Sequence, residues 1–282
     1  MKNTNNFFLL IILLISISIT AQEKLKGNKD VTTTDRNIST FSKIEVIDDV
    51  DVVFSHNENQ SVKVETDSNL QNSIYTEVNN GTLVIKTSND IVRQKELTIH
   101  IKINKHLKEI SAYNSAQIKS SNILIIDSLT INAFDKSDFN LKLNSKTVTL
   151  NTKKTSDLKL EVLSDETYIT SEESSSLKGT IDTKIISINS LDKSSINING
   201  SSNSTYLATF GNSSFKGKDF KTKNGVVKTD NSSNVYVNAS ETLDIYAKNA
   251  SEVYIYSNPK IKLIEFFDKA TLYKRELDKK FF

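Results

Sequence analysis

The sequence predicts an all-β protein, a right-handed parallel β-helix (β-solenoid) of about nine 19-residue coils that follows an N-terminal strand-rich cap. Two observations predict this fold. Apolar residues recur about every 19 positions from residue 110 onward, and within each copy they keep a spacing of two. A period of two is the alternation of a β-strand, whereas a helix repeats apolar residues at intervals of three and four. A repeat of this length indicates stacked units that bury their apolar faces against one another.

One apolar column defines the repeat and serves as its anchor. Its members are Ile118, Phe139, Leu158, Leu177, Ile196, Phe215, Val235, Val253 and Leu272. A second aliphatic column lies eight residues earlier in each copy, from Ile110 in the first to Ile264 in the ninth. We expect both columns to point into the core, with successive coils about 4.8 Å apart.

Small residues stand two and six positions before each anchor. Serine or alanine fills the nearer position in every copy, and small residues fill the farther one until Phe266 interrupts it. Small inward side chains let a chain turn without crowding the core, and serine hydroxyls can bond to backbone groups at the turn. We therefore expect tight corners between copies, with Asn199–Gly200 and Asn224–Gly225 placed at corners.

Residues 41–108 lack the 19-residue repeat but are rich in short alternating segments such as Leu97–Ile103. Asn80–Gly81 between two of these segments is a strong hairpin signal. We expect antiparallel strands here that cover the first edge of the solenoid. With the repeats of residues 109–282 they are predicted to form one continuous domain, and a charged run at 274–280 is expected to blunt the last coil.

Residues 1–21 have the features of a secretory signal peptide. Lys2 precedes a charge-free apolar run, Phe7–Ile19, and cleavage is expected near Ala21. A retained membrane anchor is the alternative. Residues 22–40 are predicted to be a polar, flexible leader. No later segment is apolar and long enough to form a membrane-spanning helix, so we expect an exported protein located in the periplasm, on the cell surface or outside the cell.

Composition excludes several classes of protein. With 36 basic and 34 acidic side chains, the near-zero net charge gives no electrostatic reason to bind nucleic acid. The absence of cysteine excludes disulfides, thiolate metal sites and a cysteine nucleophile. No phosphate-binding or dinucleotide-binding glycine motif occurs, and we expect no cofactor.

The column one residue after the anchors contains the candidate ligand-binding residues. Tyr236, Tyr254 and Tyr273 occupy it in the last three copies, where stacking would form an exposed aromatic ladder. Aromatic side chains pack on sugar rings and anchor protein partners. The alternative is tyrosine packing between strands that only stiffens these coils.

The column one residue before the anchors contains a candidate metal site. Asp138 and Asp157 occupy it in adjacent copies, and we expect the two carboxylates to stack about 5 Å apart. Such a pair could bind a hard cation such as Ca²⁺ or act as an acid and base. The alternative is two solvated aspartates that repel each other slightly.

The stretch from Arg36 to Lys119 resembles a family of exported proteins of Bacteroidetes-type bacteria, the auto-transporter adhesin head GIN domain family. The resemblance is carried by the runs FSKIEV at 41–46, VDVVF at 50–54, QSVKV at 60–64, NGTLVI at 80–85 and LTI at 97–99. It implies a β-helical body and an adhesive role. The chain departs from the family at 112–116, where AYNSA replaces a glycine-rich corner.

These observations favour a non-enzymatic, adhesin-like envelope or surface protein that binds a glycan or a cell-surface protein through its outer faces. A polysaccharide lyase or hydrolase that uses Asp138 and Asp157 is the first alternative. A purely structural periplasmic module is the second.

Overall fold

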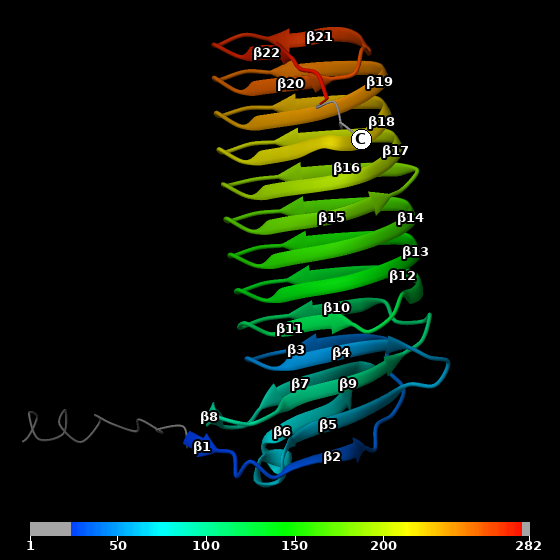
Figure 1. The fold of residues 1–282 in the computed structure, drawn as a ribbon, viewed down its shortest axis with the longest axis vertical. Helices are drawn as coiled ribbons and strands as arrows, with labels where there is room; N and C mark the ends of the chain where they lie inside the picture. Colours follow the sequence, from blue (N-terminus) through cyan, green and yellow to red (C-terminus); the bar gives the residue numbers. More distant parts are fainter. Residues whose placement is uncertain (1–23, 278–282) are drawn as a thin grey trace, which may run out of the picture.

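The computed structural model describes residues 24–277 and shows a rod of stacked β-coils (Figure 1). The predicted fold is confirmed, because nearly all of it is β and its parallel coils form a β-solenoid of about nine turns. The only helix among the described residues is the short 3₁₀ helix η1 (Ser68–Ser73). Within this part of the chain, no helix has the length and apolar character needed to cross a membrane. The expected signal peptide at 1–21 lies outside the described residues.

The strands fall into two groups along the rod. The first group builds the N-terminal end and comprises β1 (Lys24–Lys26), β2 (Val31–Arg36), β3 (Lys43–Val46), β4 (Asp51–His56), β5 (Ser61–Asp67), β6 (Ile74–Asn79), β7 (Thr82–Thr87), β8 (Asp90–Arg93) and β9 (Leu97–Ile103). The second group builds the repeats and comprises β10 (Glu109–Ala112), β11 (Gln117–Ser120), β12 (Leu124–Ala133), β13 (Asp138–Thr152), β14 (Asp157–Ser171), β15 (Ser176–Asp182), β16 (Ile185–Ser190), β17 (Ser195–Thr209), β18 (Ser214–Thr229), β19 (Asn234–Ala247), β20 (Glu252–Tyr256), β21 (Lys260–Phe266) and β22 (Thr271–Lys274).

The predicted apolar anchor column is confirmed coil by coil. Each anchor is the ladder partner of the next, from Ile118–Phe139 at the start to Val253–Leu272 at the end. All anchors from Ile118 to Val253 are at most 2% exposed. Burial of one such side chain contributes about 1.5–3 kcal/mol before entropy is subtracted. One apolar core therefore runs from Phe41 to Ile255.

One edge of each repeat coil is a tight corner of two consecutive residues with positive φ. These pairs lie four and three residues before the anchors and are Asn114–Ser115, Asp135–Lys136, Lys154–Thr155, Glu173–Ser174, Asp192–Lys193, Gly211–Asn212, Asn231–Ser232, Asn249–Ala250 and Asp268–Lys269. Left-handed backbone costs about 1–2 kcal/mol for each non-glycine residue. Hydrogen bonds between corners offset this cost, because the second residue donates its N–H to the first residue of the next corner, as Ser174 does to Asp192 at 3.0 Å.

The serines predicted at the corners are buried, and several of their hydroxyls bond to one another. The Ser175 hydroxyl lies 2.9 Å from the Thr152 hydroxyl and 2.9 Å from that of Ser171. In the next coil the hydroxyls of Ser190 and Ser194 are 2.8 Å apart. A dry corner needs such mutual bonding because a buried hydroxyl without a partner costs free energy.

The opposite edge of each coil is an open bend, which most of the later coils make within a single long strand. A second hydroxyl column lines it, formed by Ser145, Ser164, Thr183, Ser202 and Thr222. The Ser164 hydroxyl donates to Thr183 at 3.0 Å, and that of Ser202 donates to Thr222 at 2.9 Å. Sequence analysis missed this column, although a serine or threonine six or seven residues after the anchor marks it.

Some predicted positions are wrong. Asn199–Gly200 and Asn224–Gly225 lie inside β17 and β18 rather than at corners, because the corners take two left-handed residues at other positions of the repeat. In the last copy the ladder partner of Ile245 is Leu263 and not Ile264, since the register shifts directly after this pair.

The parallel stack begins before residue 109. Strand β3 pairs in parallel with both β7 and β10, and β4 pairs in parallel with both β9 and β11. The coil made by β3 and β4 is therefore inserted between a coil from β7 and β9 and the first repeat (Figure 1). Antiparallel pairs β2–β5, β5–β9 and β6–β7 close this end of the rod, as expected for a cap.

The prediction of a flexible leader is wrong for residues 24–36. Strand β2 pairs with β5 and β1 pairs with β8. The buried carboxylate of Asp67 holds this segment to the cap by accepting the backbone N–H groups of Lys29 and, at 2.7 Å, Lys95. Burial by itself raises the pKa of Asp67, but these backbone donors outweigh it and keep the pKa below its usual range. Polar composition conceals this order, because backbone groups and polar side chains such as those of Asp67, Asn69 and Gln71 make the contacts.

Among residues 24–277, no further coil packs on the one made by β21 and β22. Leu263 is 48% exposed, although its ladder partner Ile245 is fully buried. Phe266 and Phe267 are also exposed. Of the charged run expected to blunt this end, residues 278–280 lie outside the described residues.

The hydroxyls at the tight corners provide a stability test with a matched control. Ser175→Ala should lower the free energy of unfolding by about 1–2 kcal/mol, because Thr152 and Ser171 each lose a partner in a dry site. Ser137→Ala should be near neutral, since the Ser137 hydroxyl occupies the same repeat position, is equally buried and has no partner. Urea unfolding measures both. Equal losses in the two variants would contradict the assigned role of the hydroxyl bonds.

Candidate functional site

The column one residue after the anchors forms a continuous outer column along the rod. Its members are successive ladder partners and are Lys119, Asn140, Lys159, Lys178, Asn197, Lys216, Tyr236, Tyr254 and Tyr273. Because the strands pair in register, each side chain of the column lies about 4.8 Å from the one in the preceding coil. Lysines and amides therefore precede three aromatic rings in one straight line.

The three tyrosines stack as the sequence predicts. The ring centroids of Tyr236 and Tyr254 are 4.5 Å apart with 4° between the planes, and those of Tyr254 and Tyr273 are 4.7 Å apart with 15° between them. The Arg275 guanidinium lies 5.4 Å from the Tyr254 ring and 5.5 Å from the Tyr273 ring. We name this group the tyrosine ladder. Its role in binding stays a prediction.

Stacking changes what the tyrosine ladder can offer to a ligand. Each inner ring face is covered by the next tyrosine, so the ladder presents ring edges and hydroxyl groups rather than a flat aromatic strip. The Tyr254 hydroxyl donates to Glu252 at 2.7 Å, and this bond, with burial, raises the pKa of Tyr254 to about 12. Sugars pack on ring faces, and only the outer faces of the end rings remain for that contact.

A hollow of about 330 Å³ lies at the Tyr236 end of the ladder. Its lining consists of Asn197, Lys216, Lys218, Asp219, Tyr236 and Tyr256. The hollow coincides with a shift in register between β18 and β19, after Lys216. Sequence analysis missed it, although the spacing of 20 between Phe215 and Val235 marks an extra residue in this copy.

Asp138 and Asp157 are direct ladder partners, as their spacing predicts. Partial burial, and then the carboxylate of Asp157, raise the pKa of Asp138. Gln117 and Ser176 flank the pair in the same column. Ca²⁺ takes six to eight oxygen ligands, and among residues 24–277 no group of three or more acidic or histidine side chains is placed to hold a metal ion. Metal binding by the pair stays a prediction.

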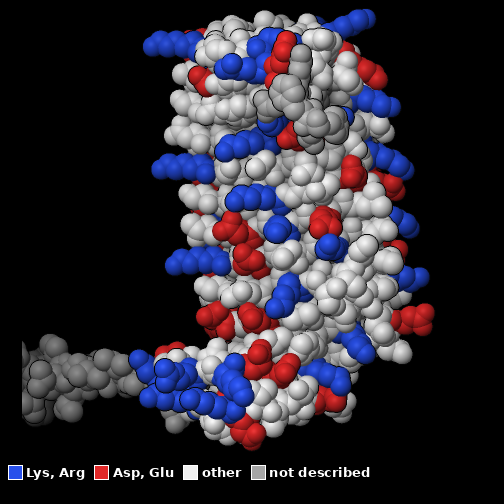
Figure 2. Space-filling model, viewed as in Figure 1, with Lys and Arg blue, Asp and Glu red and all other residues white. Residues whose placement is uncertain are grey.

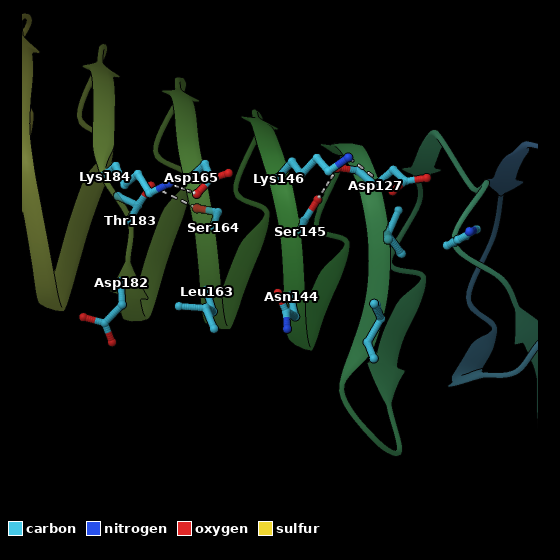
Figure 3. A pocket seen from close by; sticks show the side chains of 13 residues that line it. Asp127, Asn144, Ser145, Lys146, Leu163, Ser164, Asp165, Asp182, Thr183 and Lys184 are labelled. Atoms are coloured by element: carbon cyan, nitrogen blue, oxygen red, sulfur yellow. Dashed lines mark hydrogen bonds and ion pairs between the residues drawn. The ribbon is translucent and has the colours of Figure 1, made fainter.

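A larger hollow of about 570 Å³ lies at the open bend (Figure 3). Charged side chains along it pair with one another, with Lys184 2.7 Å from Asp165 and Lys146 4.0 Å from Asp127. Leu163 beside them is 56% exposed. Sequence analysis missed this hollow, which an apolar residue at an outward position of the strand could have indicated. Two lysine–aspartate pairs thus lie along the hollow, and Ile125, Ile126 and Leu163 add apolar surface to its lining.

Charges of both signs are interspersed over the face of the rod that Figure 2 shows. Oppositely charged side chains also pair across adjacent coils, as Lys142 does with Glu161 at 3.0 Å and Lys154 with Asp135 at 3.2 Å. Exposed pairs of this kind contribute little to stability. The mixed charges leave no large region of a single sign of charge on the face shown in Figure 2.

Comparison with known protein families agrees with the resemblance found in the sequence. The model of the family described as "Putative auto-transporter adhesin, head GIN domain" matches residues 40–161 and 159–259. The match therefore covers more than half of the chain and continues through the repeats. A search of curated proteins finds no match.

Solved structures share the fold at low sequence identity. A "putative adhesin" from Parabacteroides distasonis is 14% identical with a TM-score of 0.66, and covers 90% of this chain and 100% of its own. A "putative adhesin" from Parabacteroides merdae is 15% identical with a TM-score of 0.61, over 90% and 99%. A "putative lipid binding protein" from Parabacteroides distasonis is 18% identical with a TM-score of 0.60, over 91% and 100%. At such identities the likeness shows the fold alone.

The raised pKa of Asp138 predicts a dependence of stability on pH. The folded chain holds the Asp138 proton more readily than the unfolded chain does. Ionisation of Asp138 therefore destabilises the folded chain as pH rises through its pKa. Asp138→Asn should raise the melting temperature at pH 7 by about 1 °C, with a smaller gain at pH 3. Asp165→Asn is the control and should give no gain, because it breaks the pair with Lys184.

Calorimetry at the two pH values, with and without Ca²⁺, measures these effects. An equal gain from Asp138→Asn at both pH values would contradict repulsion within the pair. A rise in melting temperature with Ca²⁺ that Asp138→Asn abolishes would support the predicted metal site.

Proposed function

Because the chain belongs to the auto-transporter adhesin head GIN domain family, we propose that it is an exported, non-enzymatic adhesin that binds a partner through the outer face of its last coils. The partner is a glycan or a protein on another cell surface. Binding takes place outside the cytoplasm, in keeping with the signal-like residues 1–21.

The tyrosine ladder is the observation that carries this proposal. Tyrosine and arginine are enriched among the residues that dominate binding energies, and here three tyrosines and Arg275 meet on one outer face. The rings are already stacked, so little side-chain freedom remains to be lost on binding. Identical spacing of the coils also gives the ladder a rigid base.

A polysaccharide-cleaving enzyme is the second candidate, and one observation favours it. Asp138 and Asp157 are adjacent on the outer face, and the pKa of Asp138 is raised, which is typical of an acid and base pair. Release of reducing ends from acidic and neutral polysaccharides by the purified chain would support this candidate. If none of the acidic and neutral polysaccharides releases reducing ends, the enzyme candidate is excluded.

Replacement of the tyrosine ladder tests the adhesin proposal. Tyr236→Ala, Tyr254→Ala and Tyr273→Ala combined should weaken adherence of the purified protein to cells and to arrayed glycans at least tenfold. Tyr168→Ala with Tyr206→Ala is the matched control, since these two tyrosines are exposed elsewhere on the rod. The control should bind as the unmodified protein does.

A Tyr→Phe version of all three ladder positions separates binding from folding. It keeps the stacked rings and should keep most of the adherence, with an unchanged circular dichroism spectrum. Undiminished adherence of a folded triple alanine variant would contradict the proposal.

A further inference from the structure

The C-terminal end of the rod exposes side chains at positions that the coil before it buries (Figure 1). All seven residues of β21 are exposed. Ile261 and Leu263 are 44% and 48% exposed, whereas their ladder partners in β19 are fully buried. Phe266 continues the same inward row and is 36% exposed. Over the described part of the chain, the apolar core therefore ends in an apolar surface.

The same end has an unpaired strand edge. Among residues 24–277, β21 forms a ladder with β19 alone and β22 forms one with β20 alone. A strand at the edge of a sheet presents free N–H and C=O groups, which makes it a template for another chain. The end therefore offers backbone hydrogen bonds and apolar contact together.

The two ends of the rod differ in chemistry. At the N-terminal end β2 pairs antiparallel with β5, and the exposed side chains of β2 are the polar ones of Thr33, Thr34 and Asp35. Contact between this polar edge and the apolar C-terminal end would bury apolar surface on one side only. Contact between two C-terminal ends buries it on both sides, which is the more favourable arrangement.

The charges of β21 are self-complementary when two copies run antiparallel. Ile264 is bulged, because the register between β19 and β21 shifts after Leu263. Lys262 and Glu265 take outward positions on either side of this bulge. If Leu263 lies opposite Leu263 of a second copy, Lys262 of each copy is opposite Glu265 of the other. Opposite charges across antiparallel strands stabilise their pairing, and like charges oppose it.

The inward row fits the same register. Ile261 of each copy lies opposite Phe266 of the other, so apolar residues meet on both sides of the central leucine pair. A shift of two positions in one direction would place Lys262 opposite Lys262, and in the other direction Glu265 opposite Glu265. A shift of one position would set inward residues opposite outward ones. Only one register therefore satisfies both the charges and the apolar row.

We propose that two copies of this chain associate through their C-terminal ends, with β21 paired antiparallel to β21 across a two-fold axis. Each copy uses the same surface, so the contact is closed and stops at two copies. The association does not depend on the adhesin function. The chain's own residues 278–282 and an apolar segment of another protein are the other occupants that the experiments distinguish.

The dimer would bring two tyrosine ladders toward one junction. Tyr273 is the last ring of the ladder and lies in β22, in the terminal coil. For an adhesin of the proposed kind, two contact surfaces on one assembly raise the strength of attachment without any new contact. Leu263→Asp leaves the ladder unchanged, so loss of the dimer and loss of ladder contacts can be measured separately.

Sedimentation of the purified chain over a range of concentrations tests the proposal. The unmodified chain should form a species of twice the mass of one chain. Leu263→Asp should weaken this dimer at least tenfold, because it places two carboxylates at the centre of an apolar contact. Leu163→Asp is the matched control, since Leu163 is 56% exposed at the open bend, and it should leave the dimer unchanged.

Exchange of the charges tests the register. Lys262→Glu and Glu265→Lys should each weaken the dimer about tenfold, since each variant sets like charges opposite one another twice. An equimolar mixture of the two variants should recover the dimer, because their charges are complementary. Lys142→Glu is the control and should not affect the dimer, since it alters a pair with Glu161 away from this end.

The absence of cysteine allows a direct test of the central contact. Opposed residues of antiparallel strands have Cα atoms about 4.5–5.5 Å apart, within the range that a disulfide spans. Leu263→Cys should therefore form a disulfide-linked dimer under mild oxidation. Thr33→Cys, at the N-terminal end, should remain monomeric on a non-reducing gel.

Circular dichroism should be unchanged in every variant, because the replaced side chains are exposed. A chain that is monomeric at all concentrations would overturn the proposal, as would a dimer that Leu263→Asp leaves intact. Cross-linking of Thr33→Cys instead of Leu263→Cys would also overturn it. Dimers that form only after removal of residues 278–282 would assign this end to the chain's own terminus and contradict the proposal.

Discussion

Every coil of the repeats, from Asn114–Ser115 to Asp268–Lys269, turns through the same two-residue, left-handed corner, and this corner sets the register of the repeats. Corner pairs such as Glu173–Ser174 and Asp192–Lys193 bond to each other through their backbones, so each coil must turn directly above the last. Buried serine and threonine hydroxyls fill the space inside, where larger side chains would prevent the turn. The chain accepts unfavourable backbone angles at each corner because the ladder that they complete runs the length of the rod.

Because the register is fixed, the residues at one outward position of successive coils form a column on the outer surface. A tyrosine repeated at one position becomes a stack with its ring faces covered, as for Tyr236, Tyr254 and Tyr273. One departure from the repeat coincides with a hollow, where the register shifts after Lys216 beside Tyr236. This copy has one additional residue between Phe215 and Val235, and the stack of rings ends at the hollow beside Tyr236. The regular part of the rod thus positions the ladder, and one irregular copy shapes its end.

Prediction from the sequence succeeds where one residue type repeats at one offset. The anchors, the corner serines and the tyrosine ladder were all visible in this way, because register in a solenoid follows from sequence spacing alone. It fails where pairing joins segments without a repeat. The insertion of the β3–β4 coil between later strands, and the attachment of residues 24–36 through Asp67, depend on long-range contacts that no local pattern marks. The hollow beside Tyr236 was missed because its marker is one additional residue in a single copy.

Labelling of intact producing cells with a membrane-impermeant amine reagent tests most directly whether this surface faces a partner outside the cell. Lys159 and Lys178 are exposed in the outer column and serve as the reporters, with lysed cells as the reference. The account predicts that both lysines are labelled on intact cells to nearly the level reached after lysis. Labelling that appears only after lysis would place the rod inside the envelope and contradict an adhesive role.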